Sequence, residues 1–94
     1  MKIEEVMERM IDYLYEAICE MLILTEQERF EEAAFLRDDI DKKIIKVKNY
    51  IIKRDLTKLS NEQLYDNLMD IKYSFIKELS EKLEIPREHY IFNI

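Results

Sequence analysis

The sequence predicts an all-α fold in which a long antiparallel helical hairpin is followed by a third helix. Its 94 residues include no glycine and only one proline, so the residues that most tight turns require are largely missing. Apolar residues make up 48% of the chain and charged residues 38%, a mixture too hydrophobic for disorder and too charged for a membrane span. We therefore predict a single helical domain over residues 1–94, with helices at about 2–24, 28–54 and 61–84.

Heptad spacing predicts the first helix. Its apolar residues follow a four-three alternation, which is typical of a helix packed along a seam; they are Ile3, Met7, Met10, Leu14, Ala17, Met21 and Leu24. Four more apolar residues widen this stripe, namely Val6, Ile11, Ile18 and Leu22. Such a face is broader than one neighbouring helix covers, and a chain this short gains by self-association. We expect a second contact, either within the chain or between chains.

Two rows of like charge predict the register of the hairpin. Acidic residues recur at every fourth position of the first helix, at Glu4, Glu8, Asp12, Glu16 and Glu20. Basic residues recur at the same interval later, at Lys42, Lys46, Arg54 and Lys58, interrupted by Tyr50. If the chain reverses near residues 25–29, Glu8 lies near Lys46 and Asp12 near Lys42. Exposed pairs contribute about 0 to 1 kcal/mol each, so they would select the register more than stabilise the fold.

The second helix has one apolar face and an ambiguous start. Its apolar residues fall at helical spacing, at Ala33, Leu36, Ile40, Ile44 and Val47. The small side chains of Ala33 and Ala34 would let another helix approach closely. Thr25 and Glu28 have the spacing of a capping box, which would place the turn at Leu24 and Thr25. A turn two to four residues later is the alternative.

The run FEEAAFLRDDI, residues 30–40, resembles the second half of the UvrB/UvrC motif (UVR motif). The matching residues are Phe30, Glu31, Ala33, Ala34, Leu36, Arg37, Asp38 and Ile40. The preceding helix matches less well, because it has Ala17 alone where the family usually has an alanine pair. In that family the motif is a short antiparallel helical hairpin for protein–protein contact and self-association, with the reversal at the position of Arg29.

The resemblance implies a non-catalytic interaction or adaptor protein. The residues it places in partner contact are Phe30, Ala33, Ala34, Leu36, Arg37 and Ile40. Arg37 is expected to make the most specific polar contact, because it interrupts an apolar face. The competing interpretation is that these six positions only hold the fold together. The partner implied is a protein of unknown identity, together with a homodimer or higher homo-oligomer.

Capping and periodicity predict the third helix. Ser60 and Gln63 form a second capping-box pattern, which starts it. Its predicted buried stripe consists of Leu64, Leu68, Ile71, Phe75 and Leu79, joined by Tyr65, Ile76 and Leu83. Pro86 disfavours helix at Ile85, so the helix should end by about Glu84. The apolar tail, residues 85–94, could form a strand and is expected either to pack back across the helices or to pair with its copy in another subunit.

Catalytic and metal chemistry find little support in the residue types. His89 is the only histidine, and the absence of glycine excludes a nucleophile elbow or a phosphate-cradling loop. Cys19 is the only cysteine and is expected to be a small buried hydrophobe. We predict no enzyme activity, cofactor or metal site, although a magnesium site of carboxylates alone stays open. Acidic residues throughout residues 1–20 leave no run of signal-peptide type, which predicts a cytoplasmic protein.

A basic stripe supports a different class of function. Between residues 42 and 58 there are seven basic residues and one acidic residue, in a chain whose net charge is −6. An aromatic residue among such cations could bind phosphates or stacked bases; the candidate site consists of Lys42, Lys46, Tyr50, Arg54 and Lys58. Neutralisation by acidic residues, either of the first helix in the same chain or of another subunit, is the competing explanation, and we expect it to apply. A small helical inhibitor of the kind that phages encode would suit either hypothesis in size and composition.

Overall fold

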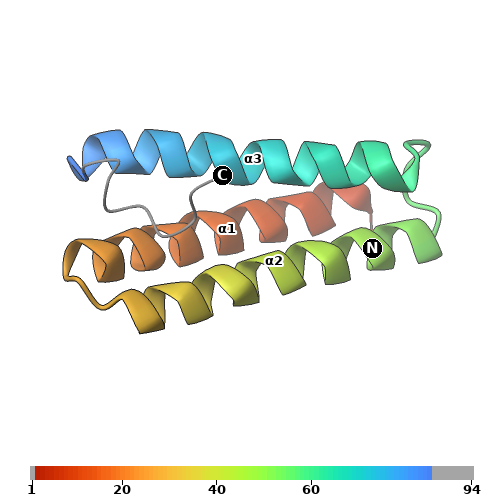
Figure 1. Ribbon diagram of the computed structural model, residues 1–94. Helices are drawn as coiled ribbons and strands as arrows, with labels where there is room; N and C mark the ends of the chain where they lie inside the picture. Colours follow the sequence, from red (N-terminus) through yellow and green to blue (C-terminus); the bar gives the residue numbers. More distant parts are fainter. Residues whose placement is uncertain (1, 86–94) are drawn as a thin grey trace.

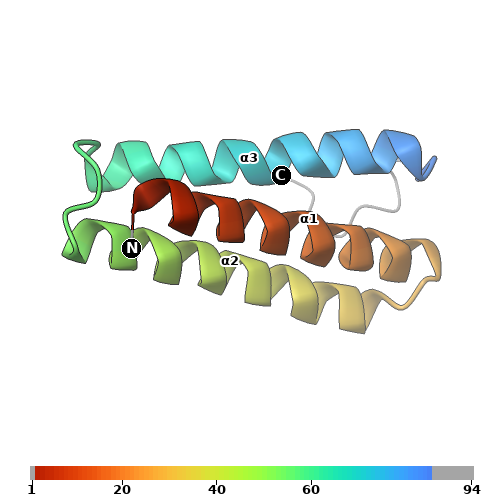
Figure 2. The same ribbon diagram turned by 180° about the vertical axis from the view of Figure 1, so that it is seen from behind.

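The computed structural model describes residues 2–85, which form three long helices lying side by side (Figures 1 and 2). Helix α1 spans Ile3–Glu26, α2 spans Phe30–Lys53 and α3 spans Asn61–Lys82. Each connection joins neighbouring ends, so α2 runs antiparallel to both α1 and α3 (Figure 1). The predicted all-α fold, a helical hairpin with a third helix, is confirmed. Residues 86–94 of the predicted tail lie outside the described residues.

All three helices contribute to one apolar core. The heptad stripe of α1 is confirmed, because its central residues are buried and its outer members pack against the core. The apolar face of α2 is confirmed as well and continues to Ile51, which is fully buried. Two residues depart from the predicted stripes: Ile11 and Leu83 are each 38% exposed. Cys19 also departs from the expected full burial, since it is only half-buried.

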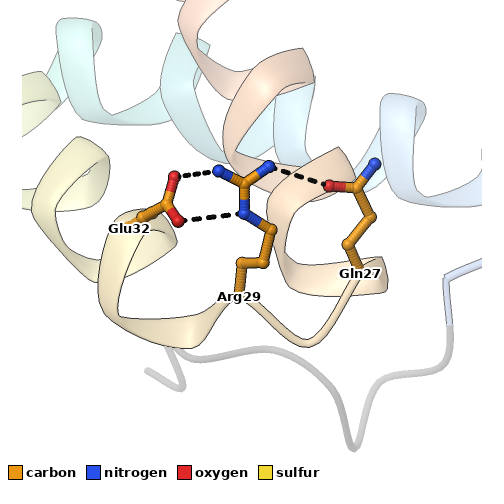
Figure 3. A network of polar contacts seen from close by, with 3 residues as sticks. All are labelled: Gln27, Arg29 and Glu32. Carbon is orange, nitrogen blue, oxygen red and sulfur yellow. Dashed lines mark hydrogen bonds and ion pairs between the residues drawn. The ribbon is translucent and has the colours of Figure 1, made fainter.

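The hairpin turn lies at residues 27–29, the later of the two positions left open by the sequence. Thr25 does not cap α2, because it sits in the last turn of α1, where its hydroxyl donates to the carbonyl of Met21 at 2.9 Å. The hydroxyl is buried there, and this bond satisfies it. Figure 3 shows how the turn is held: the guanidinium of Arg29 lies between the Glu32 carboxylate, with which it forms an ion pair, and the side-chain oxygen of Gln27.

Each of the three helices is followed, two positions after its last residue, by a left-handed residue that is not glycine. Glu28, Asp55 and Glu84 have φ of 61°, 53° and 54°. At each end, the amide of the following residue donates to a carbonyl five residues earlier: Arg29 to Leu24, Leu56 to Ile51, and Ile85 to Ser80. This is the Schellman motif, which usually has glycine at the left-handed position. A chain without glycine therefore closes its helices with acidic residues that accept an unfavourable backbone conformation.

The start of α3 agrees with the sequence prediction. The Ser60 hydroxyl accepts the amide of Gln63 at 3.1 Å, and the Gln63 side chain accepts the amide of Ser60 at 3.0 Å. Both halves of the capping box are therefore formed. Because Glu84 turns left-handed, α3 ends at Lys82, slightly before the expected position.

The core of α3 contains a lysine that the sequence analysis assigned no role. Lys72 is only 4% exposed, and its ammonium contacts the carboxylate of Asp41 on α2 at 2.6 Å. The same ammonium lies 5.4 Å from the centre of the Tyr73 ring. This ion pair ties α2 to α3 near the middle of both helices. The sequence could have predicted the burial of Lys72, since this residue falls at the same four-residue spacing as Leu64, Leu68 and Ile76.

Candidate functional site

The register-setting ion pairs expected between α1 and α2 are not formed. Within residues 2–85, neither Glu8 with Lys46 nor Asp12 with Lys42 is among the ion pairs, and all four side chains are exposed. The polar link between these helices is made by Tyr13 instead. Its hydroxyl donates to Asp39 at 3.3 Å, and the Lys43 ammonium lies 5.5 Å from its ring centre. The polar contact between α1 and α2 that we expected from the two charged rows is therefore made by Tyr13, Asp39 and Lys43, which lie closer to the line of contact between the helices.

Tyr13 has a perturbed acidity because of this position. Burial raises the pKa of its hydroxyl to about 12, and both the negative charge of Asp39 and the hydrogen bond to it act in the same direction. The phenol is therefore neutral, and a hydrogen-bond donor, throughout the physiological range.

The six residues expected at a partner-binding surface occupy different environments. Ala33 and Ile40 are completely buried in the core, where a partner could reach them only if the helices separated. Ala34, Leu36 and Arg37 are half-buried. The Arg37 guanidinium contacts the neighbouring carboxylate of Asp38 at 3.1 Å. These positions contribute more to holding the hairpin together than to its outer surface; of the six, only Phe30, at 42%, is strongly exposed.

The most exposed apolar side chain of the described chain is one that the sequence analysis did not select. Phe35 is 75% exposed, on the side of α2 opposite its buried residues. Four carboxylates lie one turn before or after it on the same helix; they are Glu31, Glu32, Asp38 and Asp39. An isolated exposed leucine would be unremarkable. A phenylalanine with its ring in water at the centre of an acidic surface is a candidate contact residue.

The charges of α2 are divided between its two halves. Residues 30–41 contain five acidic residues and one basic residue, whereas residues 42–54 contain six basic residues and no acidic one. We call the exposed side of α2, made of Glu32, Phe35, Asp39, Lys42, Lys46 and Lys53, its outer face. Successive members of this set are three, four or seven positions apart and therefore share one side of the helix. The outer face is acidic around Phe35 and basic beyond it.

A groove opens beside the basic half, between α1 and α2. It has a volume of about 410 Å³ and is lined by Val6, Arg9, Met10, Tyr13, Lys43, Val47 and Tyr50. Its apolar lining comes from both helices, while Arg9 and Lys43 bring a cation from each. The groove thus combines apolar and aromatic side chains with a cation from each helix, and its volume falls within the range of small-ligand sites.

The candidate anion-binding stripe winds from the outer face toward this groove. Lys42 and Lys46 point into solvent, whereas Tyr50 is half-buried and lines the groove. The Arg54 guanidinium stacks 4.6 Å from the centre of the Tyr50 ring, and Lys58 is exposed in the connection to α3. The structure brings Tyr50 and Arg54 together but does not gather all five residues at one point. Arg9 and Lys43 belong to the same basic region. The sequence analysis missed them because it selected basic residues that recur at every fourth position.

Other site types find no support in residues 2–85. In this part of the chain, no three His, Cys, Asp or Glu side chains are placed to hold a metal ion. None of the helices described is both long enough and apolar enough to cross a membrane. Comparisons with known proteins find no matching family model, curated protein or solved structure. The resemblance to the UVR motif therefore depends on the sequence alone and stays a prediction.

Proposed function

We propose that the chain is a non-catalytic interaction protein that binds another protein chain through the outer face of α2. The observation that carries this proposal is the exposure of Phe35. Its side chain is 75% exposed and is not among the residues that pack against the core. Burial of such a ring at an interface removes a large apolar area from water, and aromatic residues are enriched among the residues that dominate binding. The flanking charges would orient the partner. The proposal includes the cytoplasmic setting expected from the sequence, where the Cys19 thiol stays reduced.

The UVR resemblance supports the same class of function, but we place the contact on a different side of α2 from the one that the resemblance implies. Two residues that match the motif, Ala33 and Ile40, are completely buried and hold α2 against the core. The residues available to a partner are those on the other side of the same helix, together with Phe30 at its start. We therefore assign the contact to the helix that the resemblance indicates but centre it on Phe35.

Photo-crosslinking tests this proposal. A photoreactive phenylalanine analogue at position 35 should give a discrete protein adduct in cells that express the chain. The same analogue at Ser74, an exposed position on α3, is the matched control. Adducts from position 35 and none from position 74 would support the proposal. The proposal fails if position 35 gives no adduct, or if the two positions give the same adducts.

A second candidate function, capture of an anionic ligand, is favoured by the groove beside α2. Arg9 and Lys43 provide cations there, while Tyr13 and Tyr50 provide aromatic rings. A fluorescent single-stranded oligonucleotide is a suitable probe, because stacking and phosphate contacts would both contribute. Binding that weakens with salt and is lost in Arg9→Ala with Lys43→Ala, but not in the control Lys77→Ala on α3, would support this function. Absence of binding at low salt would exclude it for nucleic acid.

A further inference from the structure

We propose that the occupant of the outer face is a second copy of this chain, with the two α2 helices packed antiparallel about a two-fold axis between Lys42 and Lys43. This inference rests on the proposed function and names its partner. It follows from the division of charge within α2, from the exposed Phe35, and from the groove that lies a fixed distance away on the same helix.

The charges of α2 are complementary to themselves in one direction only. In a parallel pair, the acidic half of one helix would face the acidic half of the other, and like charges placed together are unfavourable. In an antiparallel pair about the proposed axis, two residues face each other when their numbers add to 85, as those of Lys42 and Lys43 do. Glu32 then faces Lys53 and Asp39 faces Lys46. Because the axis is two-fold, each of these pairs is formed twice.

The same register places the exposed ring at the groove. Phe35 of one copy faces Tyr50 of the other, and Tyr50 lines the groove between α1 and α2. Phe35 and Tyr50 are fifteen positions apart on α2, which corresponds to about 22 Å along a helix. Two aromatic contacts would therefore form, one on either side of the axis. The carboxylates around Phe35 would meet the groove's cations, Arg9 and Lys43.

This arrangement explains why the basic stripe has no acidic row opposite it within the chain. Lys46 is exposed and forms none of the ion pairs within residues 2–85. The anionic partner that the stripe requires is the acidic half of α2 in the second copy. The unfavourable feature is the approach of Lys42 and Lys43 from both copies at the axis. Asp38 and Asp39, one turn earlier on each helix, reduce this repulsion.

The expected dimer is weak and sensitive to salt. One pair of helices of this length gives an interface at the small end of the known range, below about 1,200 Å². Exposed ion pairs at its edges are screened by salt. We expect a monomer–dimer equilibrium that depends on concentration and shifts toward the monomer as salt is raised.

Charge reversal with mixing tests both partner and register. In the antiparallel dimer, Asp39→Lys places lysine against Lys46 twice, and Lys46→Asp places aspartate against Asp39 twice. Each variant alone should dimerise about tenfold more weakly, or worse, than the wild type in sedimentation equilibrium. An equimolar mixture should restore dimerisation as a heterodimer, because both facing pairs are then opposite in charge. The double variant Asp39→Lys/Lys46→Asp should also dimerise.

Two controls separate this effect from damage to the fold. Asp70→Lys makes the same change of charge at an exposed position of α3 and should leave the dimer unchanged. Tyr13→Phe removes the hydrogen bond that Asp39→Lys also removes, and it should still dimerise. A helical circular-dichroism spectrum confirms that each variant is folded.

The outcomes distinguish this inference from the proposed function. A wild-type chain that stays monomeric, while position 35 still crosslinks to a different protein, overturns the second copy as partner and leaves the interaction function standing. A dimer that neither charge reversal affects, or whose dimerisation is not restored by mixing, overturns the antiparallel α2 register. A monomer that also gives no crosslink removes both.

Discussion

The side chain of Tyr13 makes the stability of this protein depend on pH in the alkaline range. Its hydroxyl is held neutral by burial and by the nearby carboxylate of Asp39, and its pKa is raised to about 12. In the unfolded chain, tyrosine ionises near pH 10. A group whose pKa is higher in the folded state stabilises the fold fully below its unfolded pKa, and that stabilisation is lost as the pH rises through the folded value.

We therefore predict that alkali weakens the wild type more steeply than Tyr13→Phe. The free energy of unfolding, measured by urea titration at several pH values, should fall faster in the wild type between pH 10 and about 12. The Phe variant shares every other tyrosine, so the difference isolates position 13. Parallel decreases in the two proteins would show that the Tyr13 phenol is not linked to folding.

The buried ammonium of Lys72 depends on Asp41 for its neutralisation. Asp41→Ala leaves that charge buried without a partner and should lower the free energy of unfolding by about 3 kcal/mol or more. Lys72→Met replaces the ammonium with an apolar side chain of similar length. Because the Asp41 carboxylate is 45% exposed and can be hydrated, this change should be neutral or stabilising.

Urea unfolding of both variants tests this asymmetry. Glu78→Ala breaks the exposed pair with Lys82 and serves as the control, with an expected cost below about 1 kcal/mol. Equal losses in Asp41→Ala and Lys72→Met would contradict the claim that burial, rather than pairing as such, makes Lys72 costly.

At the scale of the element, the ends of the helices carry strain that glycine would relieve. Glu28 and Glu84 adopt left-handed conformations, which cost a residue with a β-carbon about 1 kcal/mol. Glu28→Gly and Glu84→Gly should each raise the free energy of unfolding by up to about that amount. Asp55→Gly should gain less, because aspartate tolerates this conformation better.

The same substitution inside a helix provides the opposite control. Glu16 is exposed in the middle of α1, where glycine is unfavourable, so Glu16→Gly should lose about 0.5 to 1 kcal/mol. Thermal and urea unfolding would measure all four variants. Destabilisation at positions 28 and 84 similar to that at position 16 would refute the role assigned to the helix ends.

Sequence periodicity predicted the elements well because each helix buries one stripe. The apolar residues of α1 and α2, and the Ser60 capping box, depend on local spacing that tertiary structure did not override. The hairpin turn was ambiguous because Thr25 can cap a following helix or bond back within its own. The glycine-free helix ends were not predictable, since no residue type marks a left-handed glutamate.

Sequence reasoning was less successful for the surface, and the cause lies in the whole molecule. It selected Ala33 and Ile40 as contact residues, but helix packing buries both. It paired the charged rows of α1 and α2, whereas those rows wind around their helices and stay in solvent. Phe35 could have been found, because it interrupts the charged side of α2 opposite the apolar stripe. The groove joins residues from two helices and required their placement in space.

For the whole molecule, one surface of the hairpin builds the core, while the opposite surface is exposed and is the one to which we assign association. The first carries Ala33, Ile40 and Ile44, and the second carries Phe35 between charges of opposite sign. On this proposal, stability and association respond to different residues of the same helix.

The most direct measurement is the mass of Phe35→Ala in solution, compared with its stability. Phe35 is 75% exposed and therefore contributes little to the core. The free energy of unfolding of Phe35→Ala should therefore lie within about 0.5 kcal/mol of the wild-type value. At concentrations where the wild type sediments with twice the mass of one chain, the variant should sediment as a monomer. A Phe35→Ala chain that associates as the wild type does would contradict the role given to the outer face of α2.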